Sequence, residues 1–280
     1  MEVYEIILLV LGIAVGIIAL GILLFLFLVS TRRSDGRMEK YKSVKFAHRG
    51  LHGEGRAENS MSAFMRAREN GFGIELDVRL SADGELVVFH DNDLDRVCGK
   101  EGRVADYTAA ELREMKLAGT NDGIPTFREV LEAIDGAVPL LIEIKSDKVK
   151  DGVSERVLEE LKDYRGDYIV ESFNPFMLRK IRRGRPDILI GILSCIYKKN
   201  EKTRGKPLYS LLENLYLNFL MRPDFIAYEK DGYAKRNLRF LRHTYRAPLF
   251  AWTIESAEEE AAAISHGFDS VIFEGYIPEK

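Results

Sequence analysis

Four short motifs combine side chains that could carry out acid–base and phosphate chemistry. They are His48-Arg49-Gly50, Glu75-Leu76-Asp77, His90-Asp91 and Glu143-Ile144-Lys145. Histidine titrates near neutral pH, so His48 and His90 could each exchange a proton with a substrate. Arginine and lysine bind phosphate oxygens, and arginine can donate two parallel hydrogen bonds. The motifs therefore indicate general acid–base catalysis on an anionic, phosphorylated compound.

The carboxylates of these motifs have the spacing of metal ligands on a strand. Glu75 and Asp77 are two residues apart, so on a strand both side chains face the same side. Burying carboxylates without partners costs free energy, and a divalent cation removes that cost. Glu143 would supply a third oxygen, and ligand sets made only of oxygen suit Mg²⁺ or Ca²⁺. We therefore expect one divalent cation between Glu75, Asp77 and Glu143.

Each motif alone has an ordinary structural explanation. A histidine at a strand end is usually packed or solvated, and a Glu-x-Asp pair usually lies on a solvated strand face. A Glu-x-Lys pair is usually a surface ion pair worth at most about 1 kcal/mol. The four motifs together favour a functional site, because they follow separate apolar runs and supply complementary bases, anionic ligands and cations.

The elements that would position these motifs alternate along the chain. The apolar runs predict strands at 44–48, 73–79, 86–90, 139–145, 168–172, 187–193, 224–228, 248–254 and 270–274. Helical patterns predict helices at 60–70, 108–116, 126–134, 153–164, 175–183, 207–220, 234–244 and 256–266. This alternation favours a parallel sheet covered by helices.

One junction lacks a helix. Asp83-Gly84 between two alternating runs predicts a hairpin, and a two-residue turn there would place Asp77 opposite His90. If this hairpin counts as one strand of the barrel, eight parallel strands remain, which predicts a TIM-type (β/α)₈ barrel. Most of the four motifs then lie at the carboxyl ends of strands, where barrel enzymes place their active sites.

A membrane anchor is predicted ahead of the barrel. Residues 6–29 comprise 21 apolar residues, three glycines and no charge. A helix of this length spans about 36 Å, enough for a hydrocarbon core of about 30 Å. A cleaved signal peptide is the alternative, but Glu2 and Glu5 stand where a basic region is expected, and no A-x-A site follows.

The flanking charges predict the orientation of this anchor. Residues 32–45 carry six basic and two acidic side chains, which places the large domain in the cytoplasm and the anchor in the cell membrane as a single pass. Two cysteines fit a reducing compartment. Gly12 and Gly16 form a GxxxG pair, which is more often a chance spacing than the face of a weak homodimer. The formal net charge of -3 and the absence of a reader motif argue against nucleic acid as a partner.

The motifs, in their order along the chain, resemble the glycerophosphodiester phosphodiesterase family over residues 46–275. The likeness also includes Glu58-Asn59-Ser60, Ser172-Phe173-Asn174-Pro175 and Trp252-Thr253-Ile254. It implies a TIM-type barrel with a small insertion at about 92–123. We therefore divide the chain into an anchor (1–31), a basic linker (32–43) and a barrel domain (44–280).

The resemblance also implies an activity and residue roles. The activity is metal-dependent hydrolysis of glycerophosphodiesters to sn-glycerol 3-phosphate and an alcohol, with either water or the glycerol hydroxyl as the nucleophile. The implied roles are acid–base catalysis by His48 and His90, metal binding by Glu75, Asp77 and Glu143, substrate binding by Arg49, Lys145 and Trp252, and support by Glu58 and Asn59. Many members have Thr-Asp or Thr-Asn near Glu274, so we assign Glu274 no role, and His52 is interpreted as a surface loop residue.

Two other functions stay open. The anchor and a basic stretch at residues 179–206, with ten basic and two acidic side chains, are compatible with a lysophospholipase D or another phosphodiesterase acting on membrane lipids. A membrane-bound barrel without catalysis is disfavoured by the complete set of acid–base and metal groups.

Overall fold

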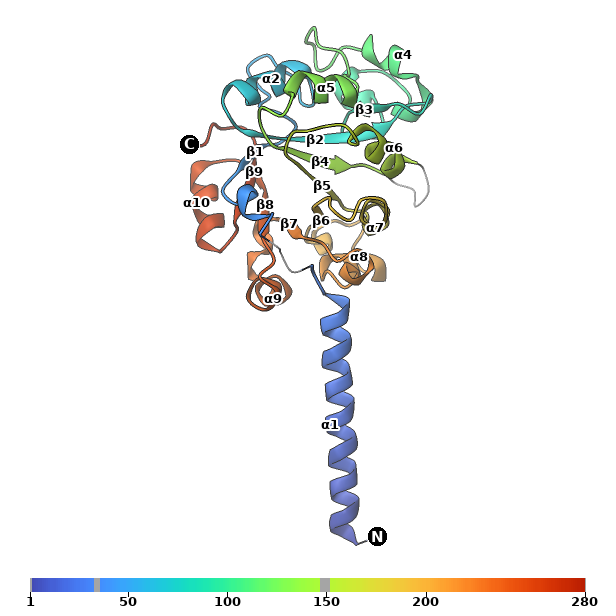
Figure 1. The fold of residues 1–280 in the computed structure, drawn as a ribbon, viewed down its shortest axis with the longest axis vertical. Helices are drawn as coiled ribbons and strands as arrows, with labels where there is room; N and C mark the ends of the chain where they lie inside the picture. Colours follow the sequence, from blue (N-terminus) through green and yellow to red (C-terminus); the bar gives the residue numbers. More distant parts are fainter. Residues whose placement is uncertain (1, 33–35, 147–151, 280) are drawn as a thin grey trace.

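A closed barrel of parallel strands forms the centre of the molecule (Figure 1). The computed structural model describes residues 2–32, 36–146 and 152–279. Within these ranges the barrel strands are β1 (Lys45–Ala47), β2 (Gly73–Leu80), β4 (Leu140–Ile144), β5 (Tyr168–Ser172), β6 (Ile190–Ser194), β7 (Phe225–Glu229), β8 (Leu249–Ile254) and β9 (Ser270–Phe273). Strand β1 pairs in parallel with both β2 and β9, which closes the barrel. The predicted TIM-type fold is confirmed.

The predicted hairpin is present, but its predicted register is wrong by one residue. Strand β3 (Leu86–Val88) pairs antiparallel to β2 with Val78 opposite Val88. The turn has three residues, 82–84, because the Ser81 N–H already donates to the Glu85 carbonyl at 3.0 Å. Gly84 closes this turn at φ +81°, a left-handed conformation that glycine adopts without strain. As a result the residue opposite Asp77 is Phe89, and His90 lies one position beyond.

Helices cover the outside of the barrel. Within the described residues these are α2 (Met61–Glu69), α5 (Phe127–Ile134), α6 (Val153–Glu160), α7 (Pro175–Gly184), α8 (Pro207–Glu213), α9 (Arg236–Phe240) and α10 (Ala257–Ser265), while the short α3 (Asp95–Cys98) and α4 (Ala109–Arg113) lie in the segment between β3 and α5. The predicted helix at 207–220 is divided: α8 ends at Glu213, and a short 3₁₀ helix, η4 (Asn218–Leu220), follows. The physical reason is Leu215, whose φ of +62° ends the helical path.

The barrel interior sets which side chains point toward the axis. An inner cluster contains Leu141, Ile169 and Ile272 together with Met38 and Tyr41 from the segment before β1. Since side chains alternate along a strand, residues two positions beyond Leu141, Ile169 and Ile272 also point inward. These positions form a second, polar layer above the apolar one. Of the predicted linker, Arg33 and Asp35 lie outside the described residues.

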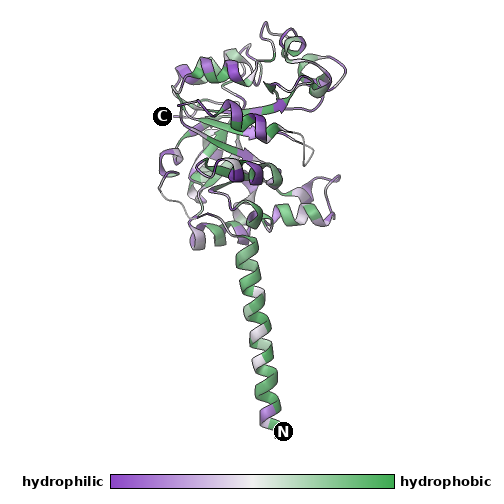
Figure 2. Ribbon diagram, turned by 45° about the vertical axis from the view of Figure 1, so that its right-hand side comes forward, coloured by the Kyte–Doolittle hydropathy of each residue, from purple (hydrophilic) through white to green (hydrophobic). Residues whose placement is uncertain are grey.

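Helix α1 (Val3–Leu28) extends away from the barrel (Figure 1). Its surface is apolar along nearly its whole length (Figure 2), and the helix is long and apolar enough to cross a membrane. Its end is attached to the barrel's outer layer: Asn218 Nδ2 donates to the Val29 carbonyl at 3.4 Å, and the Tyr245 hydroxyl donates to the Leu26 carbonyl at 3.0 Å.

Candidate active site

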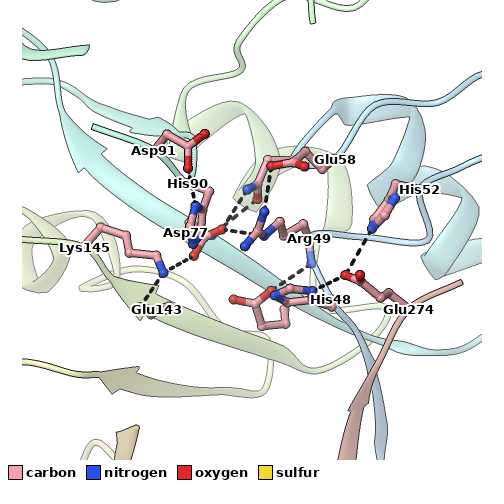
Figure 3. Close-up of polar contacts among 12 residues, drawn as sticks. His48, Arg49, His52, Glu58, Asp77, His90, Asp91, Glu143, Lys145 and Glu274 are labelled. Carbon is pink, nitrogen blue, oxygen red and sulfur yellow. Dashed lines mark hydrogen bonds and ion pairs between the residues drawn. The ribbon is translucent and has the colours of Figure 1, made fainter. Parts of the chain in front are cut away.

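The four motifs meet at the carboxyl ends of the strands (Figure 3). Glu75 and Asp77 lie on β2, and Glu143 lies beside them on β4, because the two strands pair Asp77 with Glu143. His48, His90 and Lys145 follow β1, the β3 run and β4 in turn. The structure therefore brings together the catalytic, metal and phosphate-binding candidates from four chain segments.

Glu75, Asp77 and Glu143 form a compact acidic cluster. All three are buried, and each offers a carboxylate oxygen within 4.8 Å of those of the other two. Asp77 Oδ1 accepts no hydrogen bond from any described residue, although Lys145 Nζ lies 3.2 Å away. The three buried carboxylates supply only oxygen ligands, and Asp77 Oδ1 accepts no hydrogen bond from the described residues that a metal ion would have to replace. This set of ligands fits a divalent cation such as Mg²⁺ or Ca²⁺.

The electrostatics of the cluster support the same fit. Burial raises the pKa of Glu75 well above its usual value, and Asp77 and Glu143 raise it further. Burial also raises the pKa of Glu143 to about 7, although Lys145 opposes the shift. For Asp77 burial is outweighed by Lys145, His90 and Arg49, which hold its pKa below the usual range. A cation would remove the repulsion that keeps the three groups from all being ionised.

Two cations flank the cluster. Lys145 Nζ lies 2.7 Å from Glu143 Oε1, and Arg49 donates from Nη1 to Glu58 Oε1 at 2.8 Å. The Arg49 backbone N–H donates to Glu75 Oε2 at 2.8 Å, with Arg49 held at φ +54°. Asn59 Nδ2 donates to Asp77 Oδ2 at 2.8 Å. The predicted supporting pair, Glu58 and Asn59, thus contacts the predicted phosphate-binding arginine and a predicted ligand.

Glu274, to which the sequence assigned no role, contacts His48. Its Oε2 lies 2.5 Å from His48 Nδ1 and 3.6 Å from Nε2 of His52, the predicted surface residue. The hydrogen bond from His48 lowers the pKa of Glu274 far below its usual value. Burial lowers the pKa of His48, which is therefore neutral at pH 7. Because an ionised carboxylate only accepts, the His48 proton resides on Nδ1, and Nε2 is left as an acceptor.

His90 has a matching arrangement. Its Nδ1 lies 2.7 Å from Asp91 Oδ1, and its carbonyl accepts from Arg79 Nε at 2.8 Å. Burial lowers the pKa of His90 to about 4, although Asp77 opposes the shift. Asp91 in turn accepts from Arg96 Nε at 2.6 Å. Both histidines are thus oriented by a carboxylate, with Nε2 available for proton transfer.

Two further residues near the site had no predicted role: Glu171 on β5, and Phe173, which directly follows this strand. Glu171 lies opposite Glu143, is buried, and its Oε2 lacks a hydrogen-bond partner among the described residues. Burial and the neighbouring carboxylates Glu143 and Glu75 raise its pKa well above the usual value. The Phe173 ring lies 5.8 Å from Lys145 Nζ and packs edge-on against Trp252 at 5.5 Å. Trp252 thus borders the site through Phe173.

The chain matches the model of the glycerophosphoryl diester phosphodiesterase family over residues 48–275. A glycerophosphodiester phosphodiesterase of Caldanaerobacter subterraneus is 34% identical over 82% of this chain and 93% of its own length. Glycerophosphodiester phosphodiesterase 1 of Homo sapiens is 25% identical over 83% of this chain and 78% of its own length.

Solved structures have the same fold. A glycerophosphodiester phosphodiesterase of Thermotoga maritima superimposes with a TM-score of 0.64 and 28% identity, covering 82% of this chain and 94% of the other. A phosphodiesterase of Oleispira antarctica, in complex with the product sn-glycerol 3-phosphate, gives a TM-score of 0.70 and 23% identity, covering 84% and 94%.

Proposed function

The chain belongs to the glycerophosphoryl diester phosphodiesterase family, and on that premise we propose that it hydrolyses glycerophosphodiesters to sn-glycerol 3-phosphate and an alcohol. One observation carries the proposal. The buried Glu75–Asp77–Glu143 cluster is flanked by two cationic side chains and by two neutral histidines whose Nε2 atoms are available. This arrangement supplies a binding site for a phosphodiester and groups that can move protons to and from it.

Glu75, Asp77 and Glu143 would hold one Mg²⁺ or Ca²⁺ ion, which when bound supplies positive charge to the phosphoryl oxygens. Lys145 and Arg49 add charge that is fixed before the substrate arrives, so little reorganisation is needed in the transition state. Trp252 and Phe173 form an aromatic wall beside Lys145.

His48 and His90 would act as the acid–base pair. One Nε2 takes the proton of the nucleophile, and the other histidine, protonated when the anionic substrate is bound, donates to the leaving alkoxide oxygen. Glu274 and Asp91 hold the two rings in orientation and stabilise the protonated form. Glu58 and Asn59 position Arg49 and Asp77 through the hydrogen bonds described above.

A substrate panel tests this activity. We expect the full chain to convert glycerophosphocholine and glycerophosphoethanolamine into equal amounts of sn-glycerol 3-phosphate and the free alcohol, measured by coupled enzymatic detection of both products. A Lys145→Met variant is expected to lower kcat/KM by about 10² or more, because it removes a buried charge near the phosphate. Turnover that left the diesters intact and consumed only other phosphate esters would contradict the proposal.

We also propose that residues 1–31 anchor the enzyme in the cell membrane and that the barrel domain (44–280), with an insertion at about 92–123 and a basic linker (32–43), lies in the cytoplasm. The burial of Val29 and its contact with Asn218 support an uncleaved anchor, because cleavage near this point would remove a core residue. The basic flank supports the orientation.

Protease protection tests the anchor and its orientation. In intact spheroplasts we expect the barrel domain to resist added protease and to remain attached to α1, whereas in inverted vesicles it should be digested. A domain released as a protein lacking residues 1–29, or digested in intact spheroplasts, would contradict the anchor or its orientation.

A further inference from the structure

A mainly apolar cavity opens beside the catalytic centre. It has a volume of about 690 Å³, and Glu143 and Lys145 border it. Beyond them the lining is largely aromatic and aliphatic, with Phe173, Tyr197, Leu212 and Leu217 among its side chains. The phosphate-binding end and the apolar end therefore belong to one continuous space.

The outer wall of this cavity consists of apolar side chains that are open to solvent. Leu208 on α8 is 53% exposed and Phe176 on α7 is 37% exposed, and both line the cavity. A deacylated glycerophosphodiester carries no alkyl chain that could cover these side chains. Exposed apolar groups around a concave site mark the place of an apolar ligand.

The far end of the cavity lies where the membrane helix joins the barrel. Leu217 lines the cavity. Its neighbours on both sides hold α1: the Tyr216 ring lies 6.2 Å from that of Phe25, and Asn218 Nδ2 donates to the Val29 carbonyl. Figure 1 likewise shows α8 at the end of the barrel from which α1 extends. The cavity thus extends from the catalytic centre toward the end of the barrel at which α1 is attached.

We propose that this cavity binds the single acyl chain of a lysophospholipid, so that the enzyme acts on monoacyl glycerophosphodiesters. The inference rests on the proposed function and adds the substrate class. In the reaction the oxygen of water bonds to phosphorus and the bond from phosphorus to the headgroup oxygen breaks. The proton lost by water is balanced by the one delivered to the headgroup oxygen, which gives monoacylglycerol phosphate and the free alcohol.

Chain-length dependence tests the proposal. The full chain is held in amphipol, without a bilayer, and kcat/KM is measured for glycerophosphocholine and for lysophosphatidylcholines with six, eight and ten acyl carbons below their micelle concentrations. Each fully buried methylene contributes up to about fourfold. The rate is measured by the release of choline. We expect kcat/KM to rise at least about tenfold from glycerophosphocholine to the ten-carbon substrate.

Two matched variants on α8 locate the effect. Leu208→Glu places a charge in the cavity wall and is expected to lower the ratio of ten-carbon to glycerophosphocholine kcat/KM by about tenfold. Leu211→Glu, on the same helix and 39% exposed, lies outside the cavity lining and should leave the ratio within about twofold. Because both positions are exposed, both variants are expected to fold.

The outcomes separate this inference from the proposed function. Hydrolysis of glycerophosphocholine with no dependence on chain length, or equal effects of the two variants, would overturn the lipid assignment and leave the phosphodiesterase intact. If a short diacyl phosphatidylcholine were hydrolysed as fast as the lysophosphatidylcholines, the restriction to a single acyl chain would be overturned. Failure to cleave any of the diesters would overturn the proposed function itself.

Discussion

His48→Ala is expected to lower kcat for glycerophosphodiesters by about 10² or more while the protein stays folded, because the variant loses a proton-transfer group and not a core side chain. His90→Ala should have a loss of similar size. The measurement is steady-state kinetics at saturating Mg²⁺ or Ca²⁺, with circular dichroism and thermal unfolding to confirm the fold. His243→Ala, which removes an exposed imidazole, is the matched control and should keep full activity. Full activity of either His48→Ala or His90→Ala would refute the assigned pair.

Glu274→Gln distinguishes orientation of His48 from simple packing. The amide keeps an acceptor for His48 Nδ1, so the ring position is retained, but the negative charge that raises the His48 pKa is lost. The pKa of His48 should therefore fall further below 6.5, and the limb of the pH–rate profile that His48 controls should move to lower pH. We also expect a loss in kcat of about tenfold. A profile that stayed in place would show that Glu274 has only a structural role.

Removal of the divalent cation is expected to abolish turnover, and Mg²⁺ or Ca²⁺ should restore it. Without the metal ion, the three clustered carboxylates outnumber the two cationic side chains beside them, Arg49 and Lys145, and no metal polarises the phosphoryl group. Adding the ion should also raise Tm, since an ion that binds only the folded state stabilises it. Turnover that resisted exhaustive chelation would count against the site.

Glu75→Gln should separate function from stability. Glu75 has a raised pKa, so in the absence of metal its carboxyl group binds a proton more tightly in the folded than in the unfolded chain. The folded state therefore loses stability as the pH rises above 4.5, the usual pKa of a glutamate. At pH 7 and with chelator, the variant should therefore unfold about 2–4 °C higher than the parent, equivalent to about 1 kcal/mol. In the presence of metal it should be inactive and lose the stabilisation by the ion. An unchanged Tm in the presence of chelator would mean that the buried carboxylates do not destabilise the folded state by repelling one another.

Glu129→Gln is the matched control for the loss of one carboxylate. Glu129 caps α5 by accepting from Thr126, so its substitution should lower Tm slightly and leave metal dependence unchanged. The opposite signs of the two effects would identify the stabilisation in Glu75→Gln as a property of the acidic cluster and not of charge removal in general.

Local patterns in the sequence were sufficient to predict the barrel and that the four motifs meet at the carboxyl ends of its strands. Alternating apolar runs and helical periods predicted the barrel strands, because burial of one face imposes a period of two or 3.6 residues. The same period predicted that Glu75 and Asp77 would share a face. Strands β1 and β9 pair Ala47 with Phe273. This register places the next two residues, His48 and Glu274, side by side. That contact could have been predicted from barrel closure, but departure from the family pattern led us to dismiss Glu274.

The sequence by itself determined the strands, the long apolar helix and the side-chain types of the four motifs, because each depends on residues close together in the chain. Only the tertiary structure decided the pairing of His48 with Glu274, which are 226 residues apart, and the three-residue turn that moved His90 out of line with Asp77. It also decided that Leu217 lines a cavity while its neighbour Asn218 holds α1. Such contacts depend on barrel closure and on the packing of distant segments, which no local period encodes.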